Sequence, residues 1–204
     1  MSKSEKVFKS HWLSRIDEYP QIPRMSFGLH AITRLGSLAE KLASNKQCII
    51  ITDAVLTKIG LVEEPTKIVE RAGFSVNVHE AKSAEPQLHE VKGIIEAVRG
   101  KKYGLVVGIG GGAAMDRAKI AAAMAESPGD LEEYIWPNAK PLAGSIPTIL
   151  IPTTSGTGSE CSNYAVVIVP HNEMGSTKVG IRDSVFADAA LVDPALTVSL
   201  PPRA

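Results

Sequence analysis

Hydrophobic residues between positions 25 and 125 follow two periods in turn. Short apolar runs at residues 48–52 and 74–78, and a third that begins at Tyr103, predict β-strands. Apolar residues at helical spacing predict helices at 31–43, 62–72, 88–98 and 113–125, and a short edge strand is expected at 25–28. This regular alternation predicts parallel strands joined by helical crossovers.

The pattern changes in the second part of the chain. An apolar run at residues 145–151 predicts another buried strand, runs at 165–169 and 177–181 predict a β-hairpin around a turn at 171–175, and a short strand is expected at 190–192. We therefore expect the α/β class, with a Rossmann-like, doubly wound, mostly parallel sheet and a β-hairpin. It would form one domain over residues 25–204, preceded by a polar N-terminal arm at residues 1–24.

Composition narrows the functional class. The 204 residues are 44% hydrophobic, and 22 basic residues balance 22 acidic ones. Without a basic stripe or a net charge, nothing favours a nucleic acid or an anionic membrane as a partner. No segment has the pattern of a signal peptide or a membrane span. Cys48 and Cys161 lie far apart in the chain and are expected to be free thiols, which favours a cytoplasmic protein that binds small molecules.

A glycine-rich turn joins the strand that begins at Tyr103 to the helix at 113–125. Gly110, Gly111 and Gly112 lie in this turn, where the backbone can approach a ligand closely and a helix N-terminus favours phosphate. The spacing from Gly108 to Ala113 formally matches the Rossmann fingerprint, but no acidic residue follows a second strand about 20 positions on. We favour a phosphate cradle of a different scheme over a purely structural turn.

Three other features lie near predicted strands, and each has two interpretations. Asp53 follows the strand at 48–52 and either accepts hydrogen bonds from a ribose, which would favour NAD over NADP, or caps the turn at 54–59. The hydroxyl-rich segment 153–160 either grips a phosphate, ribose or nicotinamide amide, or is a solvated turn. Lys178 points either to solvent or inward toward a ribose hydroxyl. The histidines have no metal-ligand spacing and form no catalytic triad.

These segments together resemble the iron-containing (group III) alcohol dehydrogenase family. The likeness covers residues 25–204 and rests on the glycines with Asp116 and Lys119, on Pro-Thr-Thr-Ser-Gly-Thr-Gly-Ser-Glu at 152–160, and on the motif at 188–201. It departs from the family at Ala113, where serine is common, and at Ala187, where proline is usual. The resemblance implies a dinucleotide-binding domain. In it, the pyrophosphate would contact Gly110, Gly111, Gly112 and Asp116, and the adenosine ribose would contact Asp53. The phosphate–nicotinamide side would contact Thr153, Thr154 and Thr157, and the nicotinamide ribose would contact Lys178.

The resemblance also implies a C-terminal all-helical domain whose aspartate and histidines hold Fe²⁺ or another divalent metal. Because that segment would follow Pro201 and the sequence ends at Ala204, we expect the helical domain and its metal ligands to be absent from this chain. The sequence is thus interpreted as the cofactor-binding half of an alcohol dehydrogenase that transfers hydride between an alcohol or aldehyde and NAD, with NADP less favoured. This chain alone is expected to bind nucleotide with little or no turnover, and to form a homo-oligomer through an exposed apolar face.

Three alternatives stay open. A maleylacetate reductase works without the metal, but its threonine loop typically reads Pro-Thr-Thr-Tyr-Ala-Gly-Ser-Glu. A sugar-phosphate cyclase of the dehydroquinate synthase type shares the architecture and is not expected to carry this threonine loop. A non-catalytic nucleotide-binding or assembly module would bind NADH tightly without activity.

Overall fold

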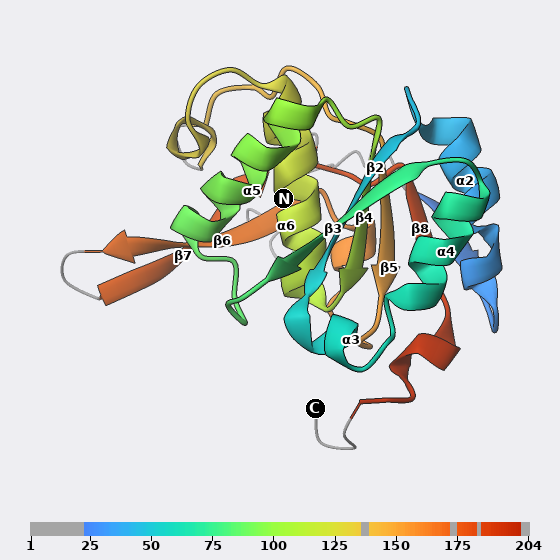
Figure 1. Cartoon of the computed structure of the whole chain (residues 1–204). Coiled ribbons are helices and arrows are strands. Elements are labelled where there is room, and N and C mark those ends of the chain that lie inside the picture. Colours follow the sequence, from blue (N-terminus) through green and yellow to red (C-terminus); the bar gives the residue numbers. More distant parts are fainter. Residues whose placement is uncertain (1–22, 136–138, 172–174, 183–184, 201–204) are drawn as a thin grey trace, which may run out of the picture.

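A six-stranded parallel sheet forms the centre of the molecule. The computed structural model describes residues 23–135, 139–171, 175–182 and 185–200, and Figure 1 shows the sheet with helices on both sides. The predicted arm at 1–24 lies outside the described residues except for its last two positions. In the order β1-β8-β5-β4-β2-β3, the strands are Arg24–Phe27, Ala189–Val192, Thr148–Pro152, Leu105–Gly110, Gln47–Asp53 and Ser75–Ala81.

Helices cover both faces of this sheet. Five α-helices are present among the described residues: α2 (Leu35–Leu42), α3 (Ala54–Lys58), α4 (Glu63–Arg71), α5 (Leu88–Lys101) and α6 (Gly112–Glu126). Short 3₁₀ turns occur at Ala31–Arg34, Leu131–Tyr134, Ser159–Cys161 and Pro194–Thr197. The predicted Rossmann-like, doubly wound α/β fold is confirmed.

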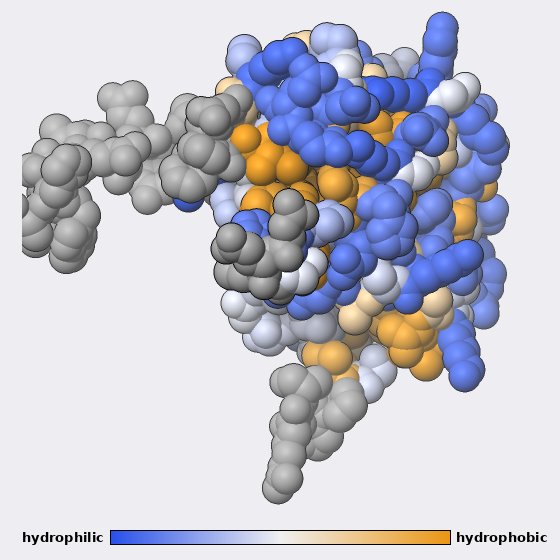
Figure 2. Space-filling model, turned by 90° about the vertical axis from the view of Figure 1, so that its left-hand side faces the viewer, coloured by the Kyte–Doolittle hydropathy of each residue, from blue (hydrophilic) through white to orange (hydrophobic). Residues whose placement is uncertain are grey.

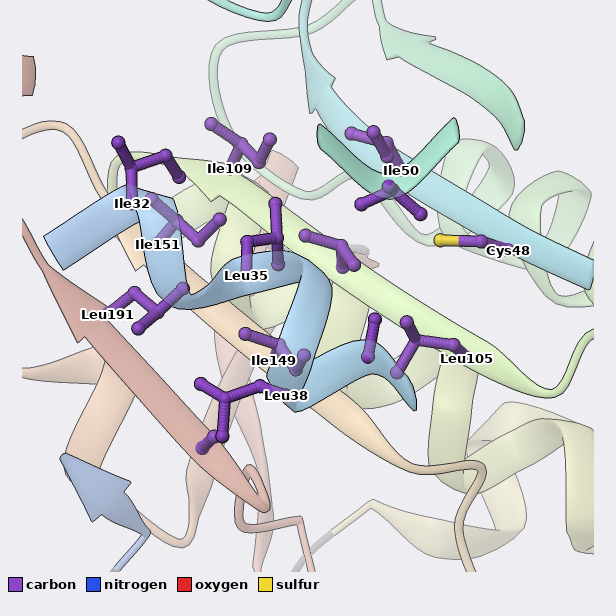
Figure 3. Packing of buried hydrophobic residues seen from close by; sticks show 14 of the residues in the cluster. Ile32, Leu35, Leu38, Cys48, Ile50, Leu105, Ile109, Ile149, Ile151 and Leu191 are labelled. Atoms are coloured by element: carbon purple, nitrogen blue, oxygen red, sulfur yellow. The ribbon is translucent and has the colours of Figure 1, made fainter. Parts of the chain in front are cut away.

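Two hydrophobic layers hold the helices to the sheet. On one face, α2 and α4 pack on the strands through Leu35, Leu38 and Val69, and Figure 3 shows isoleucine and leucine side chains meeting the α2 side chains across this layer. Cys48 belongs to the same cluster and is fully buried. On the other face, α5 and α6 pack on the opposite sides of the same strands. A parallel strand buried on both faces reads as a continuous apolar run, which is why these strands were predictable.

The hairpin is a separate two-stranded sheet rather than an extension of the main one. Its strands β6 (Tyr164–His171) and β7 (Gly175–Arg182) pair antiparallel. Side chains of Ala165, Val167 and Ile181 pack against α5 and α6, so the hairpin forms an outer layer that projects from one side of the molecule (Figure 1). Helix α6 is therefore enclosed between the main sheet and the hairpin, and residues 114–124 are all buried.

Two predicted elements begin three or more residues later than expected. The predicted helix at 31–43 opens as a 3₁₀ turn and becomes α-helical only at Leu35. The strand predicted at 145–151 begins at Thr148, because Pro147 has no N–H to donate to a neighbouring strand.

Some large apolar side chains remain on the surface. Phe27, Leu29, Val55, Ile59 and Val198 are all more than half exposed. Figure 2 shows apolar patches among hydrophilic side chains on the side from which the hairpin projects. No helix in the described part of the chain has the length and apolar content that crossing a membrane requires.

Candidate functional site

The sheet topology creates a crevice at the carboxyl ends of the central strands. Strand β4 lies between β2 and β5, and the chain leaves β2 toward β3 but leaves β4 toward β5, in opposite directions along the sheet. Ligands of open α/β sheets bind at such a reversal. A cleft of about 560 Å³ lies here, and its lining residues are Asp53, Val55, Leu56, Ala84, Gly111, Gly112, Ala113, Thr153, Thr154, Ser155, Thr157 and Leu200.

One wall of the cleft is the glycine turn that leads into α6. Gly110 has a φ of +149°, and Gly111 and Gly112 are the N-cap and first residues of the helix. A Cβ atom on Gly111 would lie 3.5 Å from Thr154, and one on Gly112 would lie 3.3 Å from the Cβ of Thr157. The missing side chains therefore keep open the space between the helix and the facing loop. The first N–H groups of α6, which have no partner within the helix, border this space.

The opposite wall is the loop that follows β5. Thr153 is buried, and its backbone N–H donates to the Gly110 carbonyl at 2.9 Å, which joins the two loops. Thr154 Oγ1 is buried and has no hydrogen-bond partner within the described part of the chain. An unpaired buried hydroxyl costs about 1–3 kcal/mol. This hydroxyl, facing the glycine turn, is thus placed to bind a polar ligand atom.

Asp53 lies at the end of β2 and borders the same cleft. It is the N-cap residue of α3, but its side chain makes no capping hydrogen bond. Its Oδ1 instead accepts a hydrogen bond from Nη1 of Arg117 at 3.2 Å. Burial raises the pKa of the Asp53 carboxyl; the charge of Arg117 opposes this rise and that of Glu90 adds to it.

Asp116 faces away from the cleft. Its Oδ1 accepts from the Ser159 hydroxyl at 2.5 Å and its Oδ2 accepts from the Val166 N–H at 2.9 Å. Lys119 lies 3.2 Å from the same carboxylate and donates to the carbonyls of Ser159 and Tyr164 at 2.9 and 2.5 Å. Burial lowers the pKa of Lys119, and Asp116 opposes this effect. This pair fastens the threonine loop and the hairpin to α6; direct contact of Asp116 with a pyrophosphate stays a prediction.

Lys178 is not part of the cleft lining. Its side chain is 61% exposed and its Nζ lies 3.0 Å from Oε2 of Glu85. Of the two interpretations of this residue, the structure shows the solvent-facing one. Its predicted contact with the nicotinamide ribose is not supported by this arrangement and stays a prediction.

A charged cluster that was not predicted from the sequence lies behind Asp53. Arg117 on α6 is completely buried and contacts Asp53, Glu90 and Ser83. Burial tends to raise the pKa of Glu90, but hydrogen bonds from Ser83 and the Lys82 N–H, together with the charge of Arg117, hold it below its usual value. The available signal was a group of three charged residues, Asp116, Arg117 and Lys119, within an otherwise apolar stretch of helix.

The remaining metal-ligating residue types form no site within the described ranges. No group of three or more His, Cys, Asp or Glu side chains there is arranged to hold a metal ion. Both cysteines are free, as predicted, with Cys48 buried and Cys161 half-buried. Burial raises the pKa of Cys48 to about 12, which makes this thiol unreactive.

Comparisons with known proteins agree on one family. The profile described as iron-containing alcohol dehydrogenase matches residues 23–194. The chain is 39% identical over 188 residues to long-chain-alcohol dehydrogenase 1 of Geobacillus thermodenitrificans, covering 91% of this chain and 46% of that protein. It is 31% identical over 182 residues to a sulfoacetaldehyde reductase of Bilophila wadsworthia, covering 89% and 46%.

Solved structures show the same fold. A sulfoacetaldehyde reductase from Bifidobacterium kashiwanohense, crystallised in complex with NAD⁺, superposes with a TM-score of 0.80 at 29% identity, over 93% of this chain and 49% of that one. An NADH-dependent butanol dehydrogenase from Thermotoga maritima gives a TM-score of 0.82 at 21% identity, over 92% and 46%. The chain thus spans about half the length of the curated relatives it matches.

Proposed function

The chain belongs to the iron-containing alcohol dehydrogenase family, and on that premise we propose that it is the NAD-binding part of a metal-dependent alcohol dehydrogenase. Hydride transfer between an alcohol or aldehyde and the nicotinamide is proposed for the whole protein, and dinucleotide binding for this chain. The names of the relatives support both parts, because they include alcohol dehydrogenases and an enzyme crystallised with NAD⁺. Homo-oligomer formation and a cytoplasmic location remain part of this proposal.

The cleft at the ends of β2, β4 and β5 fits a dinucleotide. Gly111 and Gly112 leave room beside a helix N-terminus, which suits a pyrophosphate. Asp53 supplies a carboxylate for a ribose diol, and the hydroxyls of Thr154 and Thr157 supply polar contacts on the opposite wall. The volume of about 560 Å³ lies in the usual range for small-molecule sites, about 300–1,000 Å³. Bound NAD⁺ would supply the hydride acceptor, and these residues would position it.

The unpaired hydroxyl of Thr154 is the observation that carries this proposal. Four buried side-chain atoms of the described residues have no hydrogen-bond partner, and of their residues Thr154 is the one that lines the cleft. A ligand that enters between the glycine turn and the threonine loop would supply the missing partner. The hydrogen bond from the Thr153 N–H to the Gly110 carbonyl anchors only the base of this loop, and Thr154 lies one residue beyond it in the cleft.

Filling the cradle tests the proposal. Gly112→Val places a branched side chain where a Cβ already approaches Thr157, so NADH binding by the purified chain, measured by calorimetry, should fall at least tenfold. Gly93→Val is the matched control, because Gly93 lies on the exposed side of α5 and a Cβ added there would meet no atom within 4 Å. Equal NADH binding by wild type and Gly112→Val would contradict the proposed site. If the whole protein binds NADH but does not reduce NAD⁺ with an alcohol, a non-catalytic nucleotide-binding module is favoured. Metal-independent reduction of maleylacetate would favour a maleylacetate reductase.

A further inference from the structure

Arg117 is a completely buried charged residue beside the cleft. Its side chain is 0% exposed, so it cannot touch a ligand in the cleft, yet it contacts a residue that lines the cleft. Arg117 Nη1 donates to Asp53 Oδ1 at 3.2 Å, Nη2 lies 3.0 Å from Glu90 Oε2, and Nη2 also donates to the Ser83 carbonyl at 2.6 Å. One guanidinium thus joins α6 to the ends of β2 and β3 and to the start of α5.

A purely structural role does not explain this arrangement well. Burying ionic groups seldom adds stability compared with apolar side chains of similar size, because desolvation offsets the attraction. Helix α6 is otherwise buried mainly among small and apolar residues, and apolar side chains in place of the whole ionic cluster would pack there without that cost. The contact that distinguishes Arg117 is the one to Asp53, whose side chain remains 25% exposed toward the cleft.

The two oxygens of Asp53 have different surroundings. Oδ1 is held by Arg117, whereas Oδ2 lies beside Gly110, 3.1 Å from where a Cβ would be, and accepts no hydrogen bond from the described residues. An ion pair fixes the orientation of the carboxylate as well as its charge. The free oxygen is therefore available to a donor that enters the cleft.

We propose that Arg117 is a positioning residue for cofactor selection: it holds the Asp53 carboxylate charged and oriented, so that the cleft accepts an unmodified adenosine ribose and rejects a ribose 2′-phosphate. This inference rests on the proposed dinucleotide site. A ribose diol donates hydrogen bonds to a carboxylate, whereas a 2′-phosphate is repelled by it. Arg117 itself is too deeply buried to pair with that phosphate.

The charges around Asp53 explain why a buried cation is needed. Glu90 on α5 shares the guanidinium, so Asp53 faces a second carboxylate as well as a partly dry environment, and both raise its pKa. His79 on β3 lies within the influence of Glu90 and Arg117; burial lowers its pKa, so it stays neutral near pH 7 and supplies no replacement cation. Without Arg117, the pKa of Asp53 would rise further, because an adjacent opposite charge would be lost.

The pH dependence of ligand affinity tests this role. ADP-ribose and its 2′-phosphate are suitable probes, and their dissociation constants are measured by calorimetry from pH 5 to 8. In the wild type, ADP-ribose affinity should fall only at the acidic end. In Arg117→Met the midpoint of this fall should shift upward by about one pH unit or more, and discrimination against the 2′-phosphate at pH 6.5 should fall about tenfold.

Three further variants separate positioning from stability. Arg117→Lys keeps the charge and should return the midpoint most of the way to the wild-type value, and it also serves if Arg117→Met does not fold. Asp53→Asn should lose discrimination at every pH, and adding Arg117→Met to it should have no further effect on the ratio. Arg99→Met is the matched control, since Arg99 donates to the carbonyls of Met124, Ser127 and Gly129 away from the cleft and should leave the pH profile unchanged.

The outcomes distinguish this inference from the proposed function. If the wild type binds neither ADP-ribose nor NADH, the dinucleotide site itself is wrong. If the wild type binds ADP-ribose but Arg117→Met and Arg117→Lys keep its pH profile and selectivity, Arg117 has no positioning role. A selective loss of 2′-phosphate binding in Arg117→Met would also overturn the inference, because Arg117 would then serve the phosphate.

Discussion

Thr154→Val should raise the stability of the ligand-free protein and lower its affinity for the ligand. Valine keeps the shape of threonine and replaces the hydroxyl with a methyl group. Thr154 Oγ1 is buried and unpaired within the described structure, and such a group costs about 1–3 kcal/mol. We expect the free energy of unfolding of the ligand-free chain to rise, because the unpaired hydroxyl is removed. The rise should be about 1 kcal/mol, the lower end of this range, because Thr154 as a whole is only half-buried. For a chain of this size that corresponds to an increase of about 2–4 °C in Tm.

The same substitution should weaken NADH binding. In the proposed complex the hydroxyl gains its missing partner from the ligand, and a neutral hydrogen bond contributes about 1 kcal/mol, or about fivefold in Kd. Thermal unfolding followed by circular dichroism gives the first quantity, and calorimetric titration with NADH gives the second. The variant should therefore be the more stable protein without ligand and gain less stability from a saturating concentration of NADH.

A threonine outside the cleft is the control for this experiment. The Thr66 hydroxyl on α4 donates to the Val62 carbonyl at 2.8 Å, so Thr66→Val loses a satisfied bond and should lower Tm while leaving the NADH affinity unchanged. The reasoning is refuted if Thr154→Val lowers the Tm of the free chain, since the hydroxyl would then have a stabilising partner. An unchanged Kd for NADH would refute its role in the cleft.

Other parts of the structure give three further predictions. Glu90 has a lowered pKa, so its ionisation stabilises the fold above pH 4.5, and this contribution is lost as pH falls through the lowered value. In urea titrations, the difference in free energy of unfolding between wild type and Glu90→Gln should be largest at pH 7 and should disappear in acid. A difference that does not change with pH would contradict this prediction. Lys119→Met leaves Asp116 buried without its cation, so stability should fall by about 3–5 kcal/mol and amide exchange should quicken at residues 153–166; unchanged exchange there would show that Lys119 does not hold the loop. In the native chain Ellman's reagent should leave Cys48 unmodified until guanidinium is added, whereas rapid labelling would show that the α2 layer opens.

The fold was predictable because each strand of the main sheet carries its own signal. Runs such as residues 48–52 are apolar on both faces only when both faces are covered, and the helices between them have one apolar side. The position of the hairpin was not predictable in the same way. Its strands alternate as any hairpin does, and only the packing of Val167 and Ile181 against α5 and α6 decides where it lies.

The candidate site was predictable where it depends on topology alone. Residues that directly follow neighbouring parallel strands must meet at one edge, which brings Asp53, the glycine turn and Thr154 together. Side-chain direction on α6 was not predictable, because the helix is buried on all sides and its charged residues give no polar face. Arg117 pairs with Asp53 across 64 positions of sequence, a contact that no local pattern indicates.

Hydrogen exchange with and without saturating NADH tests most directly whether the cleft binds the dinucleotide. A dinucleotide bound in the cleft should slow amide exchange in residues 110–115 and 153–157, which form the two walls, and should not slow it in α4. Exchange in β7 would report at the same time on the predicted contact of Lys178. Protection that is absent at saturating NADH, or confined to residues outside these two loops, would contradict dinucleotide binding in the cleft.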